Sequence, residues 1–339
     1  MTVLPEIIQV VDMHTAGEPV RIITGGCPPL KGDTILQKRQ DMADHHDHIR
    51  QRAMLEPRGH PEMYGAILTE PSLTNADAAV LFMHNGGYST MCGHATIALG
   101  RYLIDVGAVE RTAPITNFIL ECPCGPVTVR VDIEDGKARA VSFESVRSFA
   151  DRLDAQADVP GLGRVTYDVG YGGAYYAILP ARGFGMDLLT TPVDTLHSAA
   201  VLLLDHLRET ISVSHPEEPD LGFLYGVIVT DDAGADLSLR TRNLCVFGDG
   251  QIDRSPTGSG VSARIAVDVA RGRMSVGDKR DFAGYTNTPF TGKALREEKG
   301  GVIAQVSGRS FYSGRAELIA EDGDPLINGF GVMKTLGER

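Results

Sequence analysis

Two sixteen-residue stretches, CGHATIALGRYLIDVG at 92–107 and TGSGVSARIAVDVARG at 257–272, share a leading glycine, an internal alanine and a closing glycine. Each glycine follows a reactive type of residue, Cys92 or Thr257, and each stretch is rich in the small side chains of crowded interiors. The stretches start 165 residues apart (257 minus 92), about half of the 339-residue chain, as a duplicated unit requires. We therefore expect two similar lobes, each with a central helix whose N-terminus points at one shared cleft.

Short β-type runs surround these two helices. In the run 127–133 apolar residues alternate with polar ones, which is typical of an antiparallel strand with one wet face. Hairpin-like turns such as 134–136 follow the runs more often than helices do, so the pattern favours an α+β fold over a doubly wound sheet. The expected strands are 7–13, 20–24, 78–83, 127–133, 138–143, 175–179, 222–230, 237–247 and 302–306.

Two further segments have helical periodicity. Asp33 is placed to cap a helix over 34–55, and Asp194 is placed to cap a helix over 195–210. The apolar stripe expected on the first of these helices is formed by Ile35, Met42, His46, Ile49 and Ala53.

Length and composition indicate a globular protein of about two domains, since 42% of the residues are hydrophobic, 22% are charged and the mean hydropathy is -0.06. We expect an N-terminal lobe at 1–147 and a C-terminal lobe at 148–314, with 315–339 as a segment that could return to the first lobe. The longest aliphatic run, 199–204, is far shorter than the ~20 residues of a membrane span. The first fifteen residues lack the basic region of a signal peptide, so we expect a cytoplasmic protein without a membrane partner.

The formal charge of -12 and the lack of a basic block disfavour nucleic acid as a partner. Five cysteines, an odd number, indicate reduced thiols rather than a disulfide framework. We interpret Cys27 and Cys245 as packed thiols and the Cys122–Cys124 pair as structural.

A histidine-rich segment also suggests a metal site. His45, His46 and His48 fall on different faces of the expected helix, so one ion cannot easily hold all three, and a solvated helix face is the preferred interpretation. We expect no metal site.

Cys92 is the strongest catalytic candidate. At a helix start, unpaired N–H groups and the positive end of the helix dipole lower a thiol pKa below about 8.5, which makes the thiolate available as a base. The alternative, a buried cysteine acting as a small hydrophobe, is favoured by position alone, but the following glycine lets a ligand approach closely.

The second helix start completes a binding site for an amino acid. Backbone N–H groups at Gly93, His94, Gly258 and Ser259 can cradle a carboxylate, and Asp253 can hold a cationic amine. The alternative is that 253–260 is an ordinary Gly/Ser-rich turn.

Together, MCGH at 91–94 and DRSPTGSG at 253–260 resemble the proline racemase family, as do DMHTAGEP at 12–19, EPRGH at 56–60 and GGAYYA at 172–177. The resemblance covers nearly the whole chain. It implies a cofactor-independent enzyme of the diaminopimelate-epimerase-like fold, with two lobes of curved mixed β-sheet around central helices. It also implies a proline-like substrate, and we allow a homodimer as a possible assembly.

Thr257 departs from the family pattern, because the racemases and epimerases usually carry a second cysteine there. The Cys/Thr pair resembles that of the family's trans-3-hydroxy-L-proline dehydratases, which form Δ1-pyrroline-2-carboxylate. The alternatives are a 4-hydroxyproline 2-epimerase, a proline racemase, a non-catalytic amino-acid-binding protein of the same fold and, last, a redox or metal protein. Gly86 also departs from the acidic residue of many relatives, and His14, within a family-like stretch, has no assigned role.

Stereochemistry supports dehydration. In trans-3-hydroxy-L-proline the hydroxyl lies opposite the carboxylate, on the same face of the ring as the Cα hydrogen. Cys92 could therefore remove the Cα proton as a thiolate and then protonate the departing hydroxyl as a thiol. Thr257 would hydrogen-bond to the substrate or shape the second face.

Overall fold

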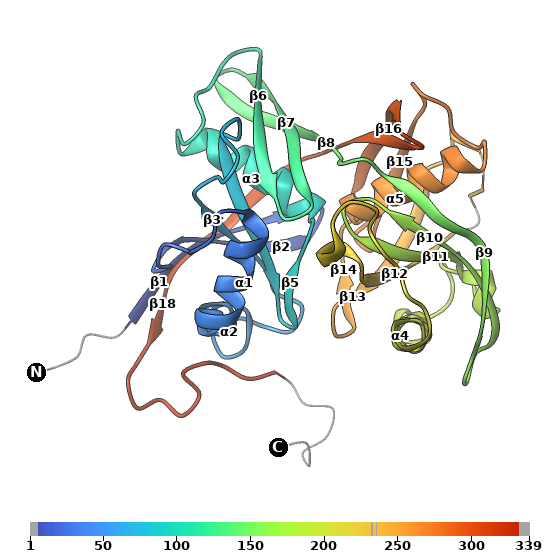
Figure 1. The fold of residues 1–339 in the computed structure, drawn as a ribbon, viewed down its shortest axis with the longest axis horizontal. Coiled ribbons are helices and arrows are strands. Elements are labelled where there is room, and N and C mark those ends of the chain that lie inside the picture. Colours follow the sequence, from blue (N-terminus) through green and yellow to red (C-terminus); the bar gives the residue numbers. More distant parts are fainter. Residues whose placement is uncertain (1–5, 232, 235, 332–339) are drawn as a thin grey trace, which may run out of the picture.

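The structure, a computed structural model, describes residues 6–331 apart from 232 and 235. Over this range, 18 strands form one hydrogen-bonded network and five α-helices pack against it. Figure 1 shows two bodies side by side, one built around α3 (Gly93–Asp105) and the other around α5 (Gly258–Ala270). The prediction of an α+β fold with two central helices is confirmed.

The body around α3 contains the N-terminal half of the chain, and α3 packs against β1, β2, β7, β8 and β18. Its elements are β1 (Glu6–Thr15), β2 (Glu18–Gly25), α1 (Ile35–His45), α2 (Asp47–Met54), β3 (Tyr64–Thr69), β4 (Ala78–His84), β5 (Gly87–Ser89), β6 (Ile115–Cys122), β7 (Gly125–Glu134), β8 (Lys137–Glu144) and β18 (Ser310–Ala320).

The body around α5 follows, and α5 packs against β9, β10, β16 and β17. Its elements are β9 (Phe149–Val159), β10 (Gly163–Tyr171), β11 (Tyr175–Pro180), α4 (Val193–Thr210), β12 (Leu224–Thr230), β13 (Thr241–Phe247), β14 (Gln251–Asp253), β15 (Lys279–Ala283), β16 (Pro289–Glu298) and β17 (Gly301–Gly308), with short 3-10 turns at Ala181–Phe184 and Pro219–Leu221.

Strand pairing joins the two bodies into one molecule. β8 pairs antiparallel with β17, and β18 returns to pair antiparallel with β1 along its whole length. One contiguous hydrophobic core includes residues of both central helices. The division of the chain at 147/148 stays a prediction.

Small residues let the central helices sit inside curved strands. A Cβ on Gly100, in the middle of α3, would lie 2.5 Å from Val141 Cγ1 on β8, closer than two carbons can approach. Glycine at this position therefore sets the distance between α3 and the strand that covers it.

The predicted caps of the two other helices are wrong. Thr34, not Asp33, caps α1, because its hydroxyl accepts the Gln37 N–H in a reciprocal capping box. The expected single helix also breaks at His46, whose ψ of 12° ends α1 before α2 begins. α4 starts at Val193 after Pro192, so Asp194 lies in its first turn and accepts the Thr195 N–H.

Two histidines of the histidine-rich segment lie next to the carboxylate of Asp41. His45 Nδ1 and His46 Nε2 lie 3.2 and 3.8 Å from the carboxylate of Asp41. Among the described residues no group of three His, Cys, Asp or Glu side chains is arranged to hold a metal ion. In the same part of the chain, no helix has both the length and the apolar character needed to cross a membrane.

Candidate active site

The N-termini of the two central helices touch through glycine. A Cβ on Gly93 would lie 2.4 Å from Gly258 Cα, and a Cβ on Gly258 would lie 2.6 Å from Gly93 Cα. Only glycine allows this backbone-to-backbone approach. The capping residues Cys92 and Thr257 are consequently brought to one place from positions far apart in the sequence.

Cys92 caps α3 through its sulfur. Its Sγ accepts the Ala95 N–H at 3.4 Å and lies 3.1 Å from His94 Nδ1, and the residue is only 5% exposed. The expected lowering of the thiol pKa is wrong for this buried position. Burial raises the pKa of Cys92 well above its ordinary value, and the Ala95 N–H only partly opposes that rise.

Thr257 has a backbone that its side chain disfavours. Its φ of 64° and ψ of 88° are left-handed, which costs a β-branched residue about 1–3 kcal/mol. The hydroxyl oxygen is buried and has no hydrogen-bond partner among the described residues. The Cys245 thiol is close enough for the Thr257 hydroxyl to oppose the rise that burial causes in the pKa of Cys245. Cys245, expected only as a packed thiol, is therefore a neighbour of the site.

Two buried carboxylates lie beside this pair. Asp253, at the end of β14, accepts the Ser255 N–H at 2.7 Å. Glu18, at the start of β2, is fully buried, and its Oε2 accepts the backbone N–H of Arg254 at 2.7 Å while its Oε1 has no partner in the described structure. Burial raises the pKa of Glu18 well above its ordinary value, and the neighbouring Asp253 adds to the rise.

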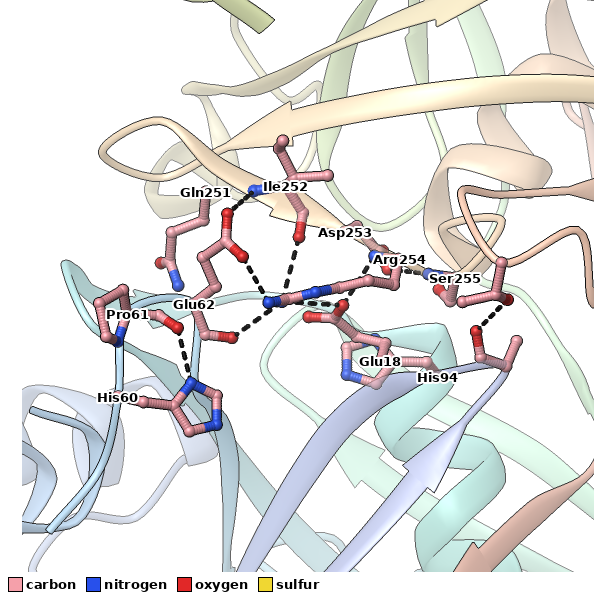
Figure 2. Close-up of polar contacts among 12 residues, drawn as sticks. Glu18, His60, Pro61, Glu62, His94, Gln251, Ile252, Asp253, Arg254 and Ser255 are labelled. Carbon is pink, nitrogen blue, oxygen red and sulfur yellow. Dashed lines mark hydrogen bonds and ion pairs between the residues drawn. The ribbon is translucent and has the colours of Figure 1, made fainter. Parts of the chain in front are cut away.

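Arg254 ties the two bodies together at the edge of the site (Figure 2). Its guanidinium forms ion pairs with Glu18 and with Glu62, both from the first body, whereas Arg254 itself follows β14 of the second. Figure 2 also shows His94 lying beside Glu18. Glu18 was not predicted as a site residue, although it belongs to the family-like stretch 12–19.

Aromatic and hydroxyl side chains close the site around Cys92. The Tyr64 ring meets the His94 ring edge-on at 4.8 Å between centroids, and the Tyr225 ring stacks on Phe247 at 5.4 Å. All four residues are buried. None of the three aromatic residues was singled out from the sequence, because each lies in a strand whose apolar pattern is equally typical of core.

The remaining site candidates lie in the first turns of the two helices. His94 follows Gly93 in α3, and Ser259 follows Gly258 in α5, where its Oγ lies 2.8 Å from the Tyr176 hydroxyl. Burial lowers the pKa of His94, so its imidazole is neutral at physiological pH. Binding of substrate by these groups stays a prediction.

Gly86 lies against a residue of the other body. A Cβ at this position would lie 2.3 Å from Asp249 Oδ2, the end of an exposed side chain, so a larger residue at 86 would displace the Asp249 carboxylate. The pair borders a cavity of about 480 Å³ that Tyr225 also lines. His14, in contrast, stacks on Phe311 at 5.5 Å, and nothing in the structure assigns it a role.

His84, beside Gly86, makes stability depend on pH. It is 5% exposed, its Nδ1 lies 3.1 Å from Gln251 Oε1, and burial lowers its pKa to about 3. Between pH 6.5 and 3 the unfolded chain therefore binds a proton that the folded protein does not, and stability falls as pH falls. From pH 7 to 5 this contribution is about 2 kcal/mol.

Urea unfolding at pH 7 and pH 5 tests this expectation. The wild type should lose more stability on acidification than His84→Gln by about that amount, whereas His60→Gln, which removes an exposed imidazole, should behave as the wild type. Equal pH dependence of the wild type and His84→Gln would contradict it.

The sequence and the structure both match known proteins along nearly their whole length. The model of the family described as proline racemase matches residues 10–331. The chain belongs to the proline racemase family. A probable proline racemase from Agrobacterium radiobacter, solved with bound carbonate, has a TM-score of 0.90 at 30% identity, covering 96% of both chains. The fold expected from the resemblance is confirmed.

Curated relatives of this chain within the proline racemase family carry the name of one particular activity. The trans-3-hydroxy-L-proline dehydratase of Homo sapiens is 46% identical over 96% of this chain and 94% of the relative. That of Colwellia psychrerythraea is 37% identical over 95% and 92%. A hydroxyproline epimerase from Agrobacterium vitis, solved with bound trans-4-hydroxy-L-proline, is 28% identical with a TM-score of 0.90 over 96% of this chain and 95% of that one.

Proposed function

We propose that this chain dehydrates trans-3-hydroxy-L-proline to Δ1-pyrroline-2-carboxylate. The observation that carries the proposal is the pair of caps at the abutting helix starts, a thiol at Cys92 and a hydroxyl at Thr257. Inversion needs an acid–base group on each face of the substrate, and a threonine hydroxyl does not ionise near neutral pH. Elimination from one face needs a single such group. The dehydratases at 37–47% identity support this function.

The site offers complementary groups for both ends of the amino acid. Backbone N–H groups in the first turns of α3 and α5, from Gly93 and His94 and from Gly258 and Ser259, would hold the carboxylate. The buried carboxylate of Asp253 would hold the ring ammonium, with Glu18 adjacent.

Substrate binding would generate the base. Burial keeps Cys92 protonated, but the ring ammonium brings a positive charge into the cleft and favours the thiolate. His94 Nδ1, 3.1 Å from Sγ, would relay the thiol proton out of the site rather than keep it, because burial lowers the pKa of His94. Cys92 would thus be ionised, and able to act as a base, only in the complex with substrate.

Elimination then proceeds on one face. The Cys92 thiolate takes the Cα proton, forming S–H, and the C–H electron pair forms the C2–C3 double bond. The C3–O bond breaks, and the S–H proton passes to the departing oxygen to give water. The enamine product tautomerises to Δ1-pyrroline-2-carboxylate.

Purified protein should be incubated separately with trans-3-hydroxy-L-proline, trans-4-hydroxy-L-proline and L-proline. We expect a ketimine product, detected with o-aminobenzaldehyde, from the first alone, and no change in optical rotation with the other two. Ligand binding without turnover would instead indicate a non-catalytic binding protein, and rapid inversion of 4-hydroxyproline would indicate an epimerase.

Asp253→Ala is expected to weaken binding of L-proline at least about ten-fold, because the ring ammonium would be left unpaired in a desolvated cleft. Calorimetric titration with L-proline measures the change. Asp132→Ala, which removes a half-exposed carboxylate far from the helix starts, is the control for net charge. Unchanged affinity in Asp253→Ala would remove Asp253 from the site.

A further inference from the structure

Three buried hydroxyls lie together next to Cys92 and have no part in the steps above. They belong to Tyr64 on β3, Ser89 on β5 and Tyr225 on β12, and each residue is less than a tenth exposed. The Tyr64 hydroxyl is hydrogen-bonded to Ser89 Oγ, and both belong to strands that pair with β4. With Ser89 as the donor of this hydrogen bond, the Tyr64 O–H is left free to donate to another acceptor.

The three hydroxyls lie on the same side of the site as Cys92 Sγ. The Tyr64 ring packs edge-on against His94 at 4.8 Å, and His94 Nδ1 lies 3.1 Å from Cys92 Sγ. The Tyr64 hydroxyl lowers the pKa of the Cys92 thiol, and the thiol in turn raises the pKa of Tyr64, as neighbouring groups do. The cluster is therefore on the Cys92 side of the site.

The 3-hydroxyl of bound trans-3-hydroxy-L-proline would face the Cys92 side of the site as well. It lies on the ring face that carries the Cα hydrogen, so a substrate that presents this hydrogen to Cys92 presents its hydroxyl there as well. Burial raises the pKa of Tyr64 well above its ordinary value, and the phenol consequently stays a neutral hydrogen-bond donor rather than a base.

We propose that Tyr64, oriented by Ser89, donates a hydrogen bond to the 3-hydroxyl of the substrate and so selects 3-hydroxylated proline and aligns its oxygen with Cys92. This inference rests on the proposed function and deepens it. Tyr64 keeps its own proton, so the proton that leaves with the oxygen is still the one that Cys92 took from Cα. The role of Tyr64 is to hold the oxygen where that proton can reach it.

The test is Tyr64→Phe, which keeps the ring and removes the hydroxyl. We expect ketimine formation from trans-3-hydroxy-L-proline to fall about 30-fold or more in kcat/KM. Tyr171→Phe is the matched control, since the Tyr171 hydroxyl is buried but has no hydrogen-bond partner in the described residues, and it should keep activity within about three-fold.

A binding measurement separates substrate contact from a structural role. In a Cys92→Ser background, in which turnover is expected to be lost, the Kd values of trans-3-hydroxy-L-proline and L-proline are compared with and without Tyr64→Phe. With Tyr64 present, trans-3-hydroxy-L-proline should bind about ten-fold more tightly than L-proline. Tyr64→Phe should abolish this preference while leaving the affinity for L-proline unchanged.

If Tyr64→Phe weakened the binding of both ligands equally, or of neither, the inference would be overturned. Ser89→Ala, which frees the Tyr64 hydroxyl without removing it, should reduce the preference only in part. A wild type that makes no ketimine from trans-3-hydroxy-L-proline would refute the proposed function itself. A wild type that is active alongside an equally active Tyr64→Phe would refute only the role of Tyr64.

Discussion

Replacing Cys92 with serine is expected to reduce turnover of trans-3-hydroxy-L-proline at least a thousand-fold, or about 4 kcal/mol of transition-state stabilisation. A serine hydroxyl ionises far above neutral pH, so no base remains at the start of α3, and the proposed scheme uses the same atom twice. The fold should survive, because serine is a favoured helix cap and can accept the Ala95 N–H as the sulfur does.

The ketimine assay and a thermal melt of the same preparation measure these two effects. Cys27→Ser is the matched control, because it removes a half-buried thiol whose pKa burial raises to about 11, and it should retain full activity. If Cys92→Ser keeps more than about a tenth of kcat, a loss of only ~1.4 kcal/mol, Cys92 is not the base.

Thr257→Cys is expected to create an activity that the parent lacks, the inversion of trans-4-hydroxy-L-proline or L-proline. A thiol there would add a second acid–base group at the start of α5, opposite Cys92. Cysteine also suits the left-handed backbone at 257 better than a β-branched residue does. Burial would raise the pKa of the new thiol as it does for Cys92, so we expect the gain to be partial.

Optical rotation with both amino acids measures the gain, and ketimine formation from the 3-hydroxylated substrate is followed in parallel. Thr257→Ser, which keeps a hydroxyl and adds no thiol, is the control and should not invert either substrate. A parent protein that inverts 4-hydroxyproline quickly with Thr257 in place would refute the dehydratase proposal, whatever the variant does.

Local sequence signals predicted the elements that carry strong patterns. The two glycine-opened helices at 93 and 258 begin where expected, and the turn at 134–136 joins β7 to β8 with φ of 50° at Asp135 and 71° at Gly136. The strand β9 was not predicted, because many of its residues are polar and only Val159 is buried. Its hairpin partner β10, with Gly163 opposite Val159, was also missed, although Val165, Tyr167 and Val169 alternate with other residues as in a half-buried strand.

The chain by itself determined which chemical groups are present and where the two helices start. The cysteine and threonine caps, their glycines and the carboxylate at 253 are properties of the sequence, and they led to the same family that the comparisons show. Only the tertiary structure decided how those groups behave. Contact between Gly93 and Gly258 brings the caps together, and burial reverses the expected shift in the pKa of Cys92. Desolvation depends on every element packed around a group, and residues such as Glu18 and Tyr64 reach the site from strands far away in the sequence.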